Sequence, residues 1–181
     1  MKSYVLLLVG CMFLSAAGKS QAPKSADEIM KQAYGIAAKE KKNVFIIFHA
    51  SWCGWCKKMD AAMNDESVKK LFTENYVIRH LVVYESRGKE NLENPGALEL
   101  LRKYKGEDQG IPYWLIFDKN GKLLADSKLR PDGGGLDTGD NTGCPASEKE
   151  VANFLRILKE TSSLKEAELA IIGKRFRENE N

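Results

Sequence analysis

The sequence lacks a strong charge of either sign. Its 28 basic and 25 acidic residues leave a formal net charge of +3 over 181 residues, and the basic residues are scattered among the acidic ones. Without a basic patch there is no electrostatic footprint for nucleic acid, so we expect no nucleic-acid partner. The chain also lacks internal repeats, and its length fits one ordinary domain behind a removable leader.

Long apolar runs are scarce too. Residues 4–14 are almost wholly apolar, but this run is too short to cross a bilayer as a helix. Lys2 before the run and small residues after it are typical of a secretory signal peptide, which we predict to cover residues 1–18. An alternative is a lipoprotein anchored through Cys11, which is less favoured because the residues after Cys11 are still apolar. We therefore expect an exported protein, either periplasmic or extracellular.

Cysteine and histidine, the usual ligands of zinc, are few. The chain has four cysteines and two histidines, and Cys53 and Cys56 form its one CxxC pair. A zinc site built on that pair would need two more ligands with compatible spacing. Beyond the leader only Cys144, His49 and His80 remain, and there is no second CxxC pair, so we expect no metal.

Two further ligand classes are disfavoured. Lys57, rather than histidine, follows Cys56, which argues against covalent haem attachment. Asp132, Asp137 and Asp140 lie in a glycine-rich stretch, but their spacing does not match a calcium-binding loop of the EF-hand type. The sequence therefore predicts no cofactor.

The most informative motif is Trp-Cys-Gly-Trp-Cys at residues 52–56. It follows the apolar run 44–48, which predicts a buried strand, and precedes residues 57–63, which predict a helix. Cys53 then lies at a helix N-terminus, where unpaired backbone N–H groups and the positive end of the helix dipole stabilise a thiolate. Cys56 is close enough to form a small disulfide, so the motif indicates dithiol–disulfide exchange.

These residues resemble the thioredoxin superfamily, and more narrowly the small exported bacterial thioredoxin-like proteins with a Trp-Cys-Gly-x-Cys-Lys-x-Met motif. The resemblance covers residues 27–158. A second signature is Gly110-Ile111-Pro112 before the apolar strand 113–118. In this family a cis-proline faces the CxxC pair at that point, and Pro112 matches the position. The resemblance implies that Cys53 attacks and Cys56 resolves, with a Cys53–Cys56 disulfide in the oxidised form.

The same resemblance implies a substrate-binding surface around the cysteines. Trp52, Gly54 and Trp55 would contribute to it, together with the platform of Ile111 and Pro112. The alternatives are core packing for the two tryptophans and a mere strand-start proline at Pro112.

One position departs from the family pattern. Thioredoxins usually carry a buried acid six residues before the first cysteine, and here that residue is Ile47. His49 is a candidate proton relay in its place, although a strand histidine more often only packs. Lys57 is a second candidate, since it could stabilise a thiolate, but it fits a solvated helix lysine equally well.

The predicted fold is α/β, a thioredoxin-like three-layer arrangement with a central mixed sheet flanked by helices and an extra C-terminal helix. The thioredoxin-like domain would span residues 25–160, and residues 161–181 would be an addition. Strands are expected at residues 44–49, 76–84, 113–118 and 122–126. Helices are expected from the capping box at 25–28 to about 41, from the cysteines to about 63, around 68–72, through 98–104, from the box at 147–150 through 158, and from the box at 163–166 to about 176.

Three local details complete the expectation. Asn120-Gly121 predicts a type I′ hairpin turn, residues 127–146 read as irregular, and residues 178–181 should fray. Cys144, in the irregular stretch, is either a buried small hydrophobic residue or a regulatory third thiol.

The predicted function is that of a thiol-disulfide oxidoreductase acting on protein disulfides. A reductase-like direction is favoured because no histidine lies between the cysteines, and a membrane thiol reductase would then supply electrons. One alternative is a binding or chaperone-like module of the same fold. Another is a pathway-specific thiol reductant, such as one in cytochrome c maturation. The sequence does not predict an oligomeric state.

Overall fold

A four-stranded mixed sheet forms the centre of the protein. The computed structural model describes residues 22–131 and 133–180, so the predicted leader, Cys11 and Asp132 lie outside the described residues. The strand order is β2-β1-β3-β4; β1 and β2 are parallel, and the other two pairs are antiparallel. The strands are β1 (Asn43–His49), β2 (Tyr76–Val82), β3 (Tyr113–Phe117) and β4 (Leu123–Asp126).

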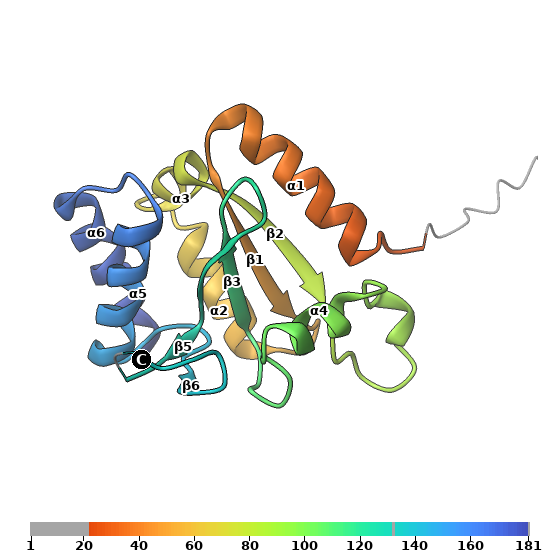
Figure 1. The fold of residues 1–181 in the computed structure, drawn as a ribbon. Helices are drawn as coiled ribbons and strands as arrows, with labels where there is room; N and C mark the ends of the chain where they lie inside the picture. Colours follow the sequence, from red (N-terminus) through yellow and green to blue (C-terminus); the bar gives the residue numbers. More distant parts are fainter. Residues whose placement is uncertain (1–21, 132, 181) are drawn as a thin grey trace, which may run out of the picture.

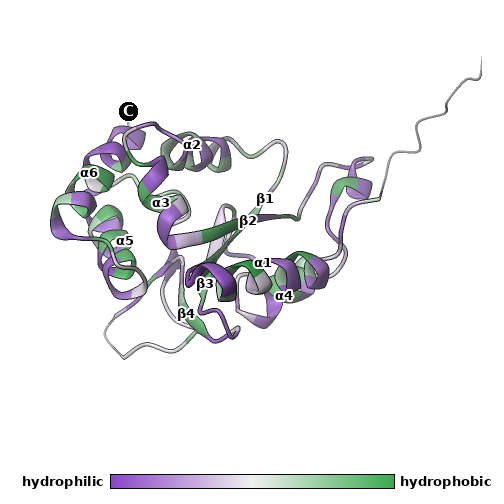
Figure 2. Cartoon of the chain, turned by 90° about the horizontal axis from the view of Figure 1, so that it is seen from above, coloured by the Kyte–Doolittle hydropathy of each residue, from purple (hydrophilic) through white to green (hydrophobic). Residues whose placement is uncertain are grey.

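Helices cover both faces of this sheet, as the predicted three-layer fold requires (Figures 1 and 2). One face carries α1 (Ala26–Glu40) and α4 (Ala97–Lys103), and the other carries α2 (Gly54–Met63), α3 (Lys69–Asn75), α5 (Glu148–Thr161) and α6 (Glu166–Arg177). Side chains of β1 alternate between the two cores: Phe45 and Ile47 pack on the α2 side, and Ile46 and Phe48 on the α1 side. Residues 44–48 are therefore all buried, which explains their continuous apolar sequence.

Two of the three predicted capping boxes are confirmed. Ser25 caps α1 with Glu28, and Ser147 caps α5 with Glu150. The box predicted at Ser163 is wrong, because the Ser163 hydroxyl donates to Asn75 Oδ1 at 2.8 Å instead. Helix α6 begins at Glu166, after the turn that this contact holds in place.

The turn between β3 and β4 is not of type I′. A type I′ turn needs positive φ at both central residues, and of this pair only Gly121 has one, at 85°. Gly121 N–H donates to the Asp118 carbonyl at 3.1 Å, while Asp118 Oδ1 accepts from the N–H groups of Asn120 and Lys122 at 2.8 and 2.9 Å. The Asp118 side chain therefore stabilises a loop that is longer than a type I′ turn and has one left-handed glycine.

Other boundaries also differ from the prediction. Strand β2 ends two residues early, at Val82, before Tyr84 adopts a left-handed φ of 56°. The stretch expected to be irregular contains a short antiparallel ladder of β5 (Lys128–Leu129) and β6 (Asp140–Asn141). The tail expected to fray forms the 3₁₀ helix η2 (Glu178–Glu180), because Asn179 is buried there and hydrogen-bonded. A second 3₁₀ helix, η1 (Glu90–Leu92), lies in the charged loop after β2.

The C-terminal helix α6 packs against α5 through aromatic rings. The Phe176 ring centroid lies 4.9 Å from that of Phe154 and 6.0 Å from that of Phe72, and all three side chains are fully buried. Phe154 in turn contacts Trp114 of β3, so the predicted extra helix is continuous with the core of the α2 face. Among the described residues, no helix combines the length and apolarity that crossing a bilayer requires.

Replacing Phe176 should therefore destabilise the whole domain. We expect Phe176→Ala to lower the free energy of unfolding by about 3–5 kcal/mol, because it removes a buried ring and leaves a cavity. Ile171→Ala on the same helix, where the side chain is 46% exposed, should change it by less than about 0.5 kcal/mol. Urea unfolding of both variants measures this, and equal small losses would mean that α6 is peripheral to the core.

Candidate active site

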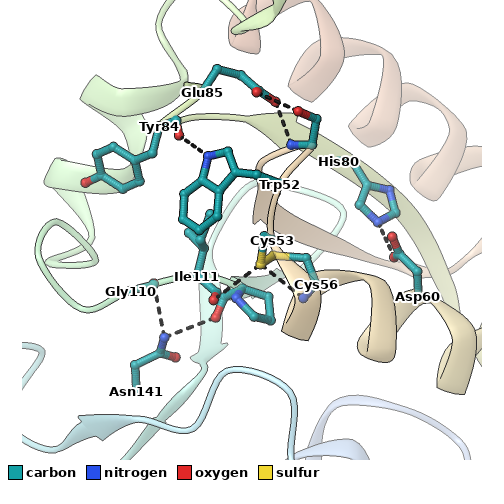
Figure 3. Close-up of a disulfide and its surroundings, with 12 residues drawn as sticks. Trp52, Cys53, Cys56, Asp60, His80, Tyr84, Glu85, Gly110, Ile111 and Asn141 are labelled. Atoms are coloured by element: carbon teal, nitrogen blue, oxygen red, sulfur yellow. Dashed lines mark hydrogen bonds and ion pairs between the residues drawn. A yellow bond between two sulfur atoms is a disulfide. The ribbon is translucent and has the colours of Figure 1, made fainter. Parts of the chain in front are cut away.

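Cys53 and Cys56 form a disulfide at the N-terminus of α2 (Figure 3). Cys53 is the N-cap residue, and the Cys56 N–H donates to its sulfur at 3.1 Å. This contact uses one of the otherwise unpaired N–H groups of the first helical turn. Negative charge developing on Cys53 would meet both that donor and the positive end of the helix dipole.

Both cysteines of the motif are almost fully shielded from solvent. From its position at a helix start beside Trp52, the sequence predicts a partly exposed Cys53 sulfur. This prediction is wrong for the oxidised form, in which Cys53 is only 3% exposed and Cys56 2%. Ala50 and Ile111 pack around the two sulfurs, and the Ile111 carbonyl oxygen lies 3.6 Å from Cys53 Sγ. Ile111 belongs to the loop that precedes β3, so part of the apolar shelter comes from a segment that the local sequence of the motif does not reveal.

The Ile111-Pro112 peptide bond is cis, as the sequence resemblance implies. Both residues border a cavity of about 250 Å³, whose lining also includes Trp55 and residues of the connection that precedes α5. Its lining residues are Trp55, Gln109, Gly110, Ile111, Pro112, Asn141, Thr142, Gly143, Cys144, Ala146 and Glu150. Ile111, Pro112 and Trp55 thus share one groove, while Trp52 and Gly54 lie outside its lining.

The two tryptophans of the motif are exposed rather than packed in the core. Trp52 is 55% and Trp55 49% exposed, which disfavours the core-packing alternative. Trp52 is nevertheless fixed, since its indole Nε1 donates to the Tyr84 carbonyl at 2.7 Å. Glu85, next along the chain, accepts from the Ser51 N–H at 2.6 Å and from its hydroxyl at 2.7 Å. The pKa of Glu85 is lowered, chiefly by the Ser51 N–H.

Lysine contacts at the motif involve Lys58 more than the predicted Lys57. Lys57 lies on the exposed side of α2, whereas Lys58 Nζ lies 4.7 Å from the centre of the Trp55 ring. Lys58 also donates to the Asn179 carbonyl at 3.0 Å. The role predicted for Lys57 stays a prediction.

A histidine–carboxylate cluster lies on the α2 side of the sheet. His49, the candidate relay, has its ring centroid 4.9 Å from that of His80, and His80 Nε2 lies 2.7 Å from Asp60 Oδ1. His80 is also the β2 partner of Ile47, the position where the family carries an acid. Burial, followed by the neighbouring His80, lowers the pKa of His49. Sequence reasoning assigned His80 no role and overlooked Asp60, although Asp60 follows Cys56 by one helical turn.

Cys144 is buried, and it is one of the residues that line the groove. Its burial raises the pKa of the thiol to about 12, and Asn179 Nδ2 lies 3.3 Å from its sulfur. This environment fits the buried-residue interpretation better than a reactive third thiol. In the described part of the chain, no group of three or more His, Cys, Asp or Glu side chains is placed to hold a metal ion.

Comparison with known proteins identifies the family. The sequence profile of a family described as thioredoxin-like matches residues 28–119, about half of the chain. The chain belongs to this thioredoxin-like family. A comparison of the thioredoxin-like chain with curated protein sequences finds no match.

Similar chains are also found among solved structures. A disulphide isomerase from Xylella fastidiosa has 20% sequence identity and a TM-score of 0.53, over 75% of this chain and 92% of that one. An oxidoreductase named DsbH has 19% identity and a TM-score of 0.41, over 87% of this chain and 95% of that one. The C-terminal domain of DsbD from Neisseria meningitidis has 23% identity and a TM-score of 0.41, over 58% and 84%. At such identities the first likeness supports the thioredoxin-like fold alone.

The raised pKa of Cys144 predicts a chemically silent thiol in the folded thioredoxin-like protein. With a pKa of about 12, roughly one molecule in ten thousand carries the thiolate at pH 8. Iodoacetamide at pH 8 should therefore leave Cys144 unmodified in the folded, oxidised protein and modify it after unfolding in guanidinium. Peptide mapping by mass spectrometry measures this, and rapid modification of the folded form would support the regulatory-thiol alternative.

The lowered pKa of His49 predicts a stability that depends on pH. Because the folded protein binds this proton less readily than the unfolded chain does, the free energy of unfolding should fall as pH drops below about 6.5. His49→Gln removes this contribution, so its free energy of unfolding should fall less between pH 7 and pH 5.5. Urea unfolding at a series of pH values tests this, and parallel curves for both proteins would contradict it.

Proposed function

We propose that this protein is a thiol-disulfide oxidoreductase that acts on protein disulfides through Cys53 and Cys56. The single observation that carries the proposal is the disulfide itself, placed at the N-terminus of α2 with the Cys56 N–H directed at Cys53 Sγ. A structural disulfide would not need a helix N-terminus at one sulfur or an adjoining groove.

In the proposed reaction the reduced protein donates two electrons to a client. The Cys53 thiolate attacks one sulfur of a client disulfide, so that a Cys53–client disulfide forms and the other client sulfur leaves as a thiolate. The Cys56 thiolate then attacks Cys53 Sγ, which closes the Cys53–Cys56 disulfide and releases the second client thiolate. Protons from the solvent or a nearby relay neutralise the client thiolates, and an external dithiol restores the reduced protein.

The client would bind over the exposed part of the motif. Trp52 and Trp55 offer aromatic surface, and Gly54 between the cysteines leaves open space, since a Cβ there would meet no atom within 4 Å. Ile111 and Pro112 supply the edge on the other side of the sulfurs. Proton transfer is proposed for His49, coupled through His80 to Asp60; Lys57 is the second candidate.

We further propose a reductase-like direction and an exported location. The direction rests on the Gly-Trp pair between the cysteines, which contains no histidine, and the location rests on the leader-like residues 4–14. An exported reductase needs electrons from across the membrane, so the partner we propose is a membrane thiol reductase. The redox potential of the Cys53–Cys56 couple, measured against glutathione, tests the direction.

Serine variants test the reaction. Cys53→Ser should reduce insulin disulfides no faster than the dithiothreitol background, because the attacking sulfur is gone. Cys56→Ser should accumulate mixed disulfides with clients, because the resolving sulfur is gone. Cys144→Ala is the matched control and should keep the activity of the unaltered protein, since Cys144 is buried and protonated.

The outcomes separate catalysis from binding. If Cys53→Ser keeps full activity, or Cys56→Ser traps no client, the exchange mechanism is wrong. If client binding is retained in a variant lacking both cysteines while the unaltered protein has no reductase activity, the binding-module alternative is correct.

A further inference from the structure

The connection between β4 and α5 returns to the groove beside the disulfide. Within it, the ladder of β5 and β6 brings Asn141 and Gly143 to the loop of residues 109–112, which are more than 25 residues earlier in the chain. Both residues line the cavity described above. This connection lies beyond residues 28–119, the part that matches the family profile.

Asn141 binds three carbonyl groups of that loop. Its side-chain Nδ2 lies 3.0, 3.2 and 3.0 Å from the carbonyl oxygens of Gln109, Gly110 and Pro112, which share its two hydrogens. Figure 3 shows the contact with Gly110. Its Oδ1 accepts from the Gly143 N–H at 3.0 Å, so the orientation of the amide is fixed from both ends. One side chain thus holds the carbonyl on each side of Ile111.

Asn141 is itself anchored to the central sheet. The next residue, Thr142, donates its N–H and its hydroxyl to the Ser127 carbonyl at 2.9 and 2.8 Å. Gly143 receives the Trp114 indole N–H on its carbonyl at 2.9 Å. Gly143 has a φ of 55°, and a Cβ there would come within 3.3 Å of the Pro112 carbonyl oxygen, so the segment lies directly against Pro112.

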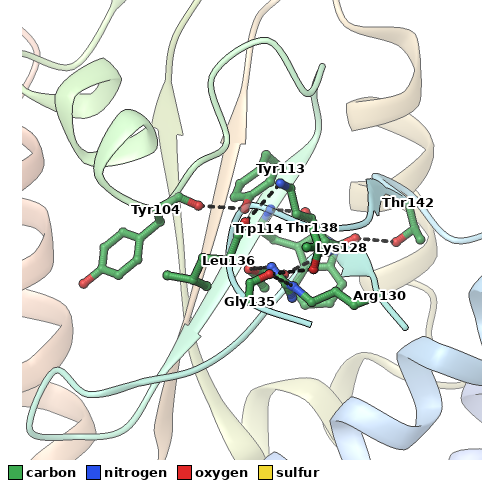
Figure 4. Close-up of polar contacts among 11 residues, drawn as sticks. Tyr104, Tyr113, Trp114, Lys128, Arg130, Gly135, Leu136, Thr138 and Thr142 are labelled. Atoms are coloured by element: carbon green, nitrogen blue, oxygen red, sulfur yellow. Dashed lines mark hydrogen bonds and ion pairs between the residues drawn. The ribbon is translucent and has the colours of Figure 1, made fainter. Parts of the chain in front are cut away.

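The loop between β5 and β6 is held in place by contacts of its own, separate from those of Asn141. Lys128 Nζ donates to the Leu136 carbonyl at 3.2 Å, and Arg130 Nε donates to the Gly135 carbonyl at 2.9 Å (Figure 4). Arg130 also pairs with the buried carboxylate of Asp126 at 2.7 Å. These contacts keep the ladder, and therefore Asn141, in a defined position.

The contacts of Asn141 determine which backbone groups of the 109–112 loop remain available to a client. Asn141 occupies the carbonyls of Gln109, Gly110 and Pro112, and Pro112 has no N–H. The Ile111 N–H has no hydrogen-bond partner among the described residues, and its carbonyl lies beside Cys53 Sγ. Ile111 is therefore the residue whose backbone edge is left for an extended client segment next to the disulfide.

We propose that Asn141 is a positioning residue, which fixes the 109–112 loop so that the Ile111 edge aligns client disulfides with Cys53. This proposal rests on the proposed function of the disulfide. Asn141 touches neither sulfur, so it acts on client binding and leaves the intrinsic reactivity of Cys53 unchanged.

Asn141→Ala tests the proposal through a split between large and small substrates. We expect KM for insulin reduction to rise about five-fold, the effect of losing one net hydrogen bond from the recognition edge, with little change in kcat. The reaction of reduced Cys53 with a small disulfide, 5,5′-dithiobis(2-nitrobenzoate), should keep its rate, because that reagent does not use the Ile111 edge. Asn141→Asp should raise KM further, since a carboxylate would face three carbonyl oxygens.

Asn75→Ala is the matched control. Asn75 also ties two distant segments through its amide, to the Leu71 carbonyl and to Ser163, but it lies away from the groove. It should lower stability without changing KM. Amide hydrogen exchange at Gln109 should accelerate in Asn141→Ala and stay unchanged in Asn75→Ala, because the Gln109 N–H donates to the Gly106 carbonyl at 3.3 Å and Asn141 holds the Gln109 carbonyl.

Several results would overturn the positioning role of Asn141. An unchanged KM, or equal rate losses with insulin and the small disulfide, overturns the positioning role. Unchanged exchange at Gln109 in Asn141→Ala overturns it too, whatever the activity. If the unaltered protein itself does not reduce insulin, the proposed function is wrong, and Asn141 then has no role in aligning clients. The exchange measurement then decides only whether Asn141 holds the loop.

Discussion

The register between β1 and β3 is the constraint on which the site depends. Phe48, near the end of β1, pairs with Tyr113, the first residue of β3, because the two strands are antiparallel. The segment that follows β1 and the segment that precedes β3 therefore meet at the same end of the sheet. The first segment carries Cys53 and the second carries Pro112. A slip of one residue would turn Phe45 and Ile47 from the α2 core into the α1 core, so the fit of these side chains into their own core fixes the register.

Local sequence was sufficient wherever one segment determines its own structure. The buried run 44–48, the capping boxes at Ser25 and Ser147, and the placement of the cysteines at a helix start all follow from neighbouring residues, and the structure has each of them. The failures have a different physical origin. Ser163 could have capped a helix, but Asn75, distant in sequence, takes its hydroxyl. The Asp118 carboxylate similarly overrides the turn preference of Asn120-Gly121.

The parts of the site that sequence reasoning missed are also long-range. Glu85 reaches Ser51, and His80 reaches Asp60 across from β2, and no spacing rule connects either pair in advance. Asp60 did carry a usable signal, because it lies one helical turn after Cys56. Asn141 carried none, since its partners become neighbours only when β5 and β6 pair.

The burial of Asn179 has a practical consequence for handling the protein. Its amide reaches Cys144 and Pro145, and its carbonyl holds Lys58, whose ammonium lies over Trp55. An affinity tag or fluorescent partner joined close behind η2 would pull on this anchor and disturb the aromatic wall of the groove. Fusions placed ahead of α1, at the far side of the molecule from η2, would leave the anchor intact (Figure 1).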